Sequence, residues 1–169
     1  MLLRACFGKK MDLPKRKSNR LENYDCGTEG AYFITLCTQN RAKILSNVVG
    51  DDAHIVPKEY GVIIEKYICN VPEIEKYVIM PDHIHLIIRI ENGTMWASSP
   101  TKRVLSIIRS LKILTTKEIG KSIFQRSFYD HIIRNQNDYN EIWEYIDNNP
   151  TKWLETHKKD KDSSVWVVL

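Results

Sequence analysis

Residues 80–90 read MPDHIHLIIRI, an aliphatic run headed by two histidines, and this stretch decides how the rest of the chain is interpreted. Side chains on a β-strand point alternately to opposite faces of a sheet. His83 and His85 therefore share one face. The other face is wholly apolar and consists of Ile84, Leu86, Ile88 and Ile90. We expect a strand that buries its apolar face under helices and presents two imidazoles on the other.

The sequence on either side predicts further strands and helices. Residues 31–40 and 75–81 are rich in β-forming side chains and predict two strands, and a third candidate strand covers 124–133. Apolar spacing and end signals predict three helices, over 57–72, 98–120 and 137–149. Pro150 is expected to end the last of them.

Length and composition are typical of one globular domain. The chain has 169 residues, 43% of them hydrophobic, and a formal net charge of +4, which is compatible with a nucleic-acid partner without requiring one. We assign a basic arm to 1–30, the domain to 31–155 and a polar tail to 156–169. Four cysteines without CxxC spacing predict free thiols in a reducing compartment. With no long apolar run and no signal-like N-terminus, we expect a soluble, cytoplasmic protein.

Basic residues gather on the predicted 98–120 helix. Lys102, Arg109 and Lys112 fall on one flank of its apolar stripe, and Arg134 follows the 124–133 segment. Two explanations remain open for the three helical residues, a solvated helix edge or a ridge that binds phosphates.

The histidine pair suggests a metal site but does not establish one. Two neutral imidazoles spaced two residues apart on a strand can bind one metal ion, although such pairs also occur on surfaces without a metal. A further ligand has to come from elsewhere in the chain.

The predicted 137–149 helix offers that ligand and a possible nucleophile. Its core stripe is formed by Tyr139, Ile142, Trp143 and Ile146, so Tyr139 is interpreted as a packing residue. Tyr145 lies off the centre of that stripe and is either a tyrosine at the rim of the core or a nucleophile held on a rigid helix. Asn149 follows one turn later on the same side, where its amide oxygen could join the two histidines.

In combination these motifs resemble the single-tyrosine HUH transposases of the insertion-sequence type, closest to the REP-associated tyrosine transposases. The motifs are YVIMPDHIHLII (77–88), DHIIRN (130–135) and YIDNNP (145–150), and the resemblance runs from about Tyr32 to Trp153. One departure is Asp82, where asparagine is frequent in the family. The resemblance implies an α+β, ferredoxin-like fold, an antiparallel sheet with helices packed on one face.

The resemblance also implies a function. His83, His85 and Asn149 would bind Mg²⁺ or Mn²⁺, and Tyr145 would attack a phosphodiester of single-stranded DNA near a hairpin to form a 5′-phosphotyrosine. Lys102, Arg109, Lys112 and Arg134 would hold the DNA backbone. We expect a monomer or homodimer with no membrane association.

Two alternatives remain. The chain could be a non-mobile hairpin-binding protein that retains the site. It could instead be a metal hydrolase of phosphodiesters that completes the histidine pair with Asp130 or His131 and activates a bound water.

Overall fold

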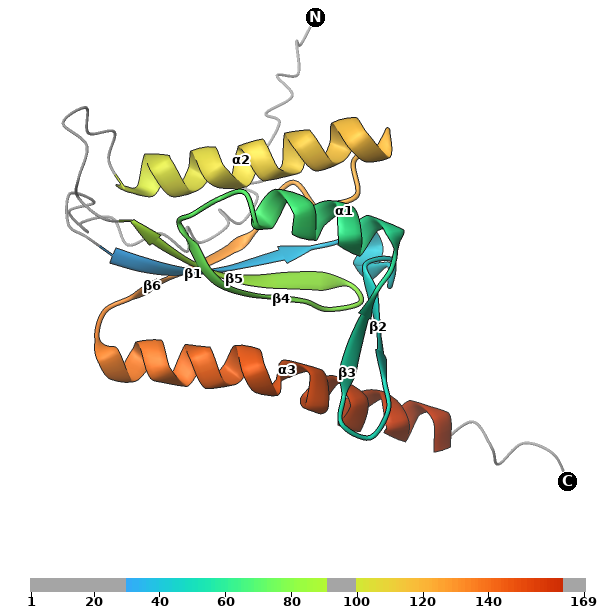
Figure 1. Cartoon of the computed structure of the whole chain (residues 1–169). Coiled ribbons are helices and arrows are strands. Elements are labelled where there is room, and N and C mark those ends of the chain that lie inside the picture. The colour runs from blue at the N-terminus through green and yellow to red at the C-terminus, as the bar shows by residue number, and fades with distance from the viewer. Residues whose placement is uncertain (1–29, 91–99, 163–169) are drawn as a thin grey trace, which may run out of the picture.

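The centre of the molecule is a four-stranded antiparallel sheet with the strand order β4-β5-β1-β6 (Figure 1). The computed structural model describes residues 30–90 and 100–162. The strands are β1 (Gly30–Cys37), β4 (Ile74–Ile79), β5 (His83–Ile90) and β6 (Tyr129–Ile133). Each falls within or next to a segment that the sequence predicted as a strand, and β1 and β5 form the centre of the sheet.

Two helices, α1 (Glu59–Ile68) and α2 (Pro100–Ile119), lie across one face of the sheet (Figure 1). The main core forms beneath them from apolar side chains of β1, β5, α1 and α2; its members include Ile34, Leu36, Ile64, Ile68, Ile84, Leu86, Ile88, Ile108 and Leu111. The apolar face predicted for β5 is thus buried under helices. The order β1-α1-β4-β5-α2-β6 with antiparallel pairing is the ferredoxin-like arrangement. The expected fold class is therefore confirmed, with α1 and α2 on one face as expected and a third helix added on the other.

A long helix, α3 (Gln136–Asp162), crosses the opposite face of the sheet (Figure 1). A smaller core lies between them. It contains Ile146 of α3 with Ala31, Phe33, Val78, Met80, Ile87 and Ile133 of the sheet, and Tyr139, Ile142, Trp143 and Trp153 pack against it. The predicted apolar stripe of this helix is therefore confirmed.

The prediction that Pro150 ends this helix is wrong, because α3 continues through Pro150 to Asp162. A proline inside a helix removes one backbone N–H and crowds the preceding turn. Here Ile146 before it and Trp153 after it both pack on the smaller core, which keeps the two halves on the same sheet face. Residues 156–162, assigned to a tail, are thus helical, while the basic arm and residues 163–169 lie outside the described residues.

The sequence analysis missed a hairpin of two short strands, β2 (Ser46–Val49) and β3 (His54–Pro57), inserted between β1 and α1. It is attached to the sheet by its first residues. The backbone N–H of Leu45 donates to the carbonyl of Pro81, and the Ser46 hydroxyl donates to the carbonyl of Ile79 at 2.7 Å.

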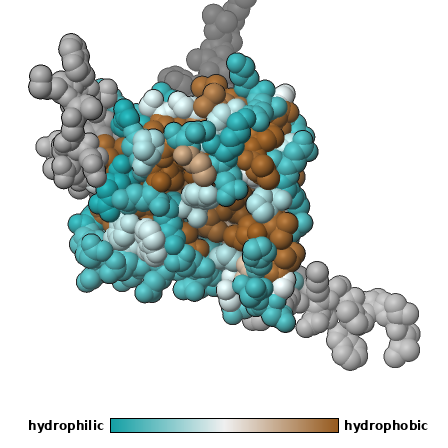
Figure 2. Space-filling view, in the orientation of Figure 1, coloured by the Kyte–Doolittle hydropathy of each residue, from teal (hydrophilic) through white to brown (hydrophobic). Residues whose placement is uncertain are grey.

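The surface on the side of the molecule seen in Figure 1 carries both apolar and polar residues. Figure 2 shows hydrophobic side chains exposed among hydrophilic ones on the side of the molecule seen in Figure 1. No helix among the described residues combines the length and apolarity needed to cross a bilayer. Cys37 and Cys69 are free thiols, as expected.

Candidate active site

The face of β5 opposite the main core carries the two histidines. In the sheet register His83 pairs with Cys37 and His85 pairs with Thr35, so all four side chains belong to the face that α3 crosses. Both imidazoles are buried, with 8% and 4% of their surface exposed, and their ring centres are 4.6 Å apart. The side-by-side placement predicted from the sequence is confirmed.

Each imidazole is oriented by a partner at its Nδ1 atom. The Nδ1–H of His83 donates to the Asp82 Oδ1 at 2.5 Å, because a carboxylate can only accept. Nδ1 of His85 is hydrogen-bonded to the Thr35 hydroxyl at 2.9 Å. When Nδ1–H donates, Nε2 presents its lone pair, and histidines that bind metals are usually held in this way.

The Nε2 atom of His85 is buried and has no hydrogen-bond partner. An unsatisfied buried polar atom is costly and calls for an explanation, such as an ion that is not present. Burial, followed by the charges of the neighbouring His83 and Arg41, lowers the pKa of His85 to about 3. The ring is therefore neutral at ordinary pH, which is the form that binds metals.

Asp82 connects this pair to the loop after β1. Its side chain is buried and lies 3.6 Å from the guanidinium of Arg41, a residue of the short helix η1 (Gln39–Arg41). Its backbone carbonyl accepts hydrogen bonds from both the N–H and the hydroxyl of Thr38. Asp82 is thus fixed through its backbone, and its carboxylate holds His83.

Tyr145 approaches the histidines from α3. Its ring centre lies 5.2 Å from that of His85 and 6.0 Å from that of Phe33, and 40% of the residue is exposed. The exposed part gives a substrate access to the side chain while the ring is supported at the sheet. Lys152 places its ammonium 5.4 Å from the centre of the Tyr145 ring.

Asn149 lies one turn after Tyr145 and is 92% buried, with 8% of its surface exposed. Because α3 continues through Pro150, Asn149 lies within the helix and not at its end. Because residues four apart share one side of a helix, Asn149 is on the same side as Tyr145.

The sequence analysis missed a second aromatic residue at this site, Trp153. Its ring centre is 5.9 Å from that of His83, and the ring is stacked on His157 at 4.1 Å. Lys43, from the loop after β1, holds its ammonium 5.5 Å from the centre of the Trp153 ring. The signal available in the sequence was the four-residue spacing of Tyr145, Asn149 and Trp153, which was hidden by the assumption that Pro150 ends the helix.

Three of the predicted DNA-binding residues, Lys102, Arg109 and Arg134, lie away from this site, whereas the charge of Lys112 interacts with Cys37 at the end of β1 beside it. Lys102 and Arg109 are exposed on α2, which covers the other face of the sheet. Lys112 is half-buried, and its ammonium donates to the carbonyl of Gln125 at 2.8 Å, so it ties α2 to the loop before β6. Arg134 follows Ile133, whose partner Ala31 is at the opposite end of β1 from Thr35.

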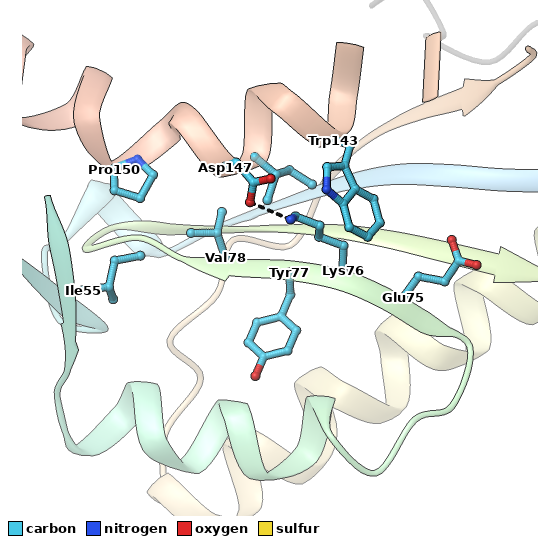
Figure 3. Close-up of a pocket in the computed structure, with 9 residues that line it drawn as sticks. Ile55, Glu75, Lys76, Tyr77, Val78, Trp143, Asp147 and Pro150 are labelled. Atoms are coloured by element: carbon cyan, nitrogen blue, oxygen red, sulfur yellow. Dashed lines mark ion pairs between the residues drawn. The ribbon is translucent and has the colours of Figure 1, made fainter. Parts of the chain in front are cut away.

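A pocket opens on the other flank of α3, beside the edge strand β4. Figure 3 shows Lys76 and Val78 pointing toward α3 and Tyr77 pointing to the opposite side of the strand. The Lys76 ammonium forms an ion pair with Asp147 at 2.5 Å and lies 4.1 Å from the centre of a Trp143 ring. This flank is thus held by a salt bridge, whereas the flank with Tyr145 faces the histidines.

The residues proposed for a hydrolytic metal site are not assembled. Nε2 of His131 is hydrogen-bonded to Oδ2 of Asp138 at 3.0 Å. Within the described part of the chain, no cluster of three or more histidine, cysteine or acidic side chains is arranged to hold a metal. The two imidazoles and the amide of Asn149 could hold a metal, and the buried Nε2 of His85, which has no hydrogen-bond partner, fits such a role.

The comparisons with known proteins agree with this geometry. Residues 27–149 match the family described as "Transposase IS200 like", which covers most of the chain. The chain therefore belongs to the IS200-like transposases. It is 31% identical over 163 residues to an uncharacterized protein of Haemophilus influenzae (82% of this chain, 89% of that protein).

The relatives also include members of the REP-associated branch, as the motifs predicted. A REP-associated tyrosine transposase of Escherichia coli is 36% identical over 81 residues, covering 47% of this chain and 45% of that one. A solved structure described as a REP-associated tyrosine transposase bound to a REP hairpin has a TM-score of 0.53 and 27% identity, covering 80% of this chain and 74% of that chain.

Proposed function

We propose that this transposase cleaves and rejoins single-stranded DNA through a 5′-phosphotyrosine intermediate at sites flanked by hairpins, with the help of a divalent metal. The observation that carries the proposal is the contact of Tyr145, exposed and rigidly supported, with a buried histidine whose Nε2 has no partner. A nucleophile and a vacant donor atom on one sheet face are the two parts that such chemistry requires.

The covalent step is a phosphoryl transfer to the tyrosine. The Oη atom of Tyr145 attacks the phosphorus, an Oη–P bond forms and the P–O3′ bond breaks. The phenolic proton passes to solvent, and the departing 3′ oxygen ends as a hydroxyl. Because the new phosphodiester retains the bond energy, a 3′-hydroxyl of another strand can attack it, release Tyr145 and rejoin DNA without a nucleotide cofactor.

His83, His85 and Asn149 would hold the metal, Mg²⁺ or Mn²⁺. When bound, such an ion supplies a positive charge that offsets the charge developing on the phosphate oxygens. Asp82 and Thr35 keep the two imidazoles in the orientation that exposes Nε2. Imidazole donors suit Mn²⁺ better than the harder Mg²⁺.

The proposed substrate is single-stranded DNA with a hairpin. Support comes from the relative solved with a REP hairpin and from cations that surround the site, namely Arg41, Lys43 and Lys152. The exposed residues Lys102, Arg109 and Arg134 remain proposed contacts for the strand beyond the site.

The deciding experiment compares Tyr145→Phe with Tyr139→Phe. Wild-type protein is incubated with labelled single-stranded hairpin DNA and Mn²⁺ and run on a denaturing gel, where a covalent adduct migrates with the protein. We expect the adduct to disappear in Tyr145→Phe and to persist in Tyr139→Phe, since the Tyr139 hydroxyl donates to Glu75.

An adduct formed by Tyr145→Phe would refute the assignment of the nucleophile. Free 5′ ends without protein would favour hydrolysis, and tight binding without any cleavage by the wild type would favour a hairpin-binding protein.

A further inference from the structure

We propose that Trp153 and Lys43 form a binding site for one nucleotide, the one whose 3′ oxygen departs when Tyr145 attacks. This inference rests on the proposed function and deepens it, because it assigns the unpaired base upstream of the cleaved bond to a particular side chain.

The nucleophile and the tryptophan lie on one side of α3 at the two ends of the histidine pair. Tyr145 and Trp153 are eight residues apart, which is about 12 Å along a helix, and Asn149 lies between them. Tyr145 contacts His85, whereas Trp153 contacts His83. The reaction site at the histidines is therefore bracketed by an aromatic nucleophile and a second aromatic ring.

The Trp153 ring is supported on one side and partly exposed. His157 stacks on it with ring centres 4.1 Å apart and an angle of 21° between the planes. Nδ1–H of His157 also donates to the backbone carbonyl of Trp153 at 2.9 Å, which fixes the stacked ring. A ring held in this way loses little freedom when a base stacks on it.

A cation accompanies this ring. The Lys43 ammonium lies over the ring, 5.5 Å from its centre, on an exposed side chain that can turn aside to a phosphate when a base stacks on the ring. An aromatic platform with a neighbouring cation is the usual combination for single-stranded nucleic acid, where the base stacks and the phosphate is neutralised.

The direction of the reaction decides which nucleotide this site receives. In phosphoryl transfer the attacking and departing oxygens lie roughly in line on opposite sides of the phosphorus. With Tyr145 attacking from the His85 end, the departing 3′ oxygen and its nucleoside point toward the His83 end, where Trp153 lies. Trp153 is therefore a positioning residue for the upstream nucleoside and holds its 3′-hydroxyl for the reverse reaction.

The test uses a series of synthetic hairpin oligonucleotides, each with an abasic site at a different unpaired position. The affinity of the protein for each oligonucleotide is measured without added metal. Stacking of one base on an aromatic side chain corresponds to roughly a 5- to 150-fold change in affinity. We expect one position, directly 5′ of the cleavage point mapped on a gel, to show this loss with the wild type. In Trp153→Leu the same abasic substitution should have no further effect, because the partner ring is gone.

Two variants serve as controls. Trp153→Phe keeps a ring and should retain most of the effect of the base. Trp143→Leu removes a tryptophan from the other flank of α3 and should behave like the wild type. Lys43→Ala should lower the slope of log K against log salt by about 0.7 if it neutralises one phosphate.

The outcomes separate this inference from the proposed function. If the abasic substitution at the upstream position lowers affinity equally in wild type and Trp153→Leu, or does not lower it in the wild type, the inference is overturned. The proposed function then still stands as long as the covalent adduct forms. If no adduct forms with any strand, the proposed function fails, yet a base effect that vanishes in Trp153→Leu still supports the stacking site. Should Trp153→Leu fail to fold, the wild-type series decides: a loss of affinity at the upstream position supports the inference, and no loss there overturns it.

Discussion

Removing the carboxylate of Asp82 tests whether the histidine pair is held ready for a metal. The Asp82 Oδ1 is 2.5 Å from Nδ1 of His83, and both groups are buried. Loss of a partner that orients a metal-binding histidine typically lowers metal affinity 10- to 100-fold. We expect Asp82→Ala to weaken Mn²⁺ binding by that factor, because the His83 ring can then rotate or change tautomer.

Asp82→Asn provides the graded comparison. Its amide oxygen can still accept from Nδ1–H, so only the charge is lost, and we expect less than a tenfold decrease in Mn²⁺ affinity. Calorimetric titration of wild type and both variants measures the effect. The hydrogen bonds from Thr38 to the backbone carbonyl of residue 82 remain in each.

Arg41→Ala is the matched control for charge alone. The Arg41 side chain is 58% exposed and 3.6 Å from Asp82, and exposed ion pairs of this kind contribute little. Its Mn²⁺ affinity should stay within about threefold of wild type. If Asp82→Ala binds Mn²⁺ as tightly as wild type, the carboxylate does not orient a ligand and the reasoning is refuted.

Three further predictions concern stability. The pKa of His85 is about 3 in the folded protein against 6.5 ordinarily, so between these values the unfolded chain binds a proton that the folded chain does not. The free energy of unfolding should therefore decrease as pH falls through this window, by about 1.4 kcal/mol per pH unit, and His85→Gln should remove this component in acid denaturation series. Lys112→Met should lower the free energy of unfolding in urea by about 1–2 kcal/mol without changing the salt dependence of DNA binding, and an altered salt slope would show that Lys112 contacts phosphates. Ile84→Ala, in the main core, should cost about 3 kcal/mol, whereas Tyr145→Phe should change stability by less than about 0.5 kcal/mol in the same denaturation assay.

The sequence was sufficient for the regular elements and for the faces of β5. The alternation of side chains in 83–90 follows from the two-residue repeat of a strand, and the apolar stripe around Ile146 follows from the 3.6-residue repeat of a helix. Both repeats can be recognised within a short segment of sequence. The hairpin formed by β2 and β3 escaped because it is short and half exposed, so its residues carry little hydrophobic alternation. Its position depends on bonds such as Ser46 to Ile79, which connect segments 33 residues apart.

The sequence predicted the reactive groups of the candidate site but not the residues that orient them. Tyr145 and the histidines form recognisable motifs, and Asn149 follows from helical spacing. The partners Thr35 and Asp82, and the approach of Trp153 to His83, depend on how strands and α3 meet in space. Pro150 illustrates the same limit. The local rule that proline ends a helix failed here because residues before and after Pro150 both pack on the smaller core.

The two faces of the sheet have different roles: one contributes most of the core, and the other carries the candidate site. The interior under α1 and α2 holds most of the large, fully buried side chains, so mutations there are removed by selection for folding. The face under α3 contributes a smaller interior, and residues such as Tyr145 and Lys152 can be exchanged with little loss of stability. Substitutions on the α3 face could therefore alter the proposed recognition or remove the proposed chemistry while the scaffold persists. Lineages that lose mobility would retain a folded domain available for another use.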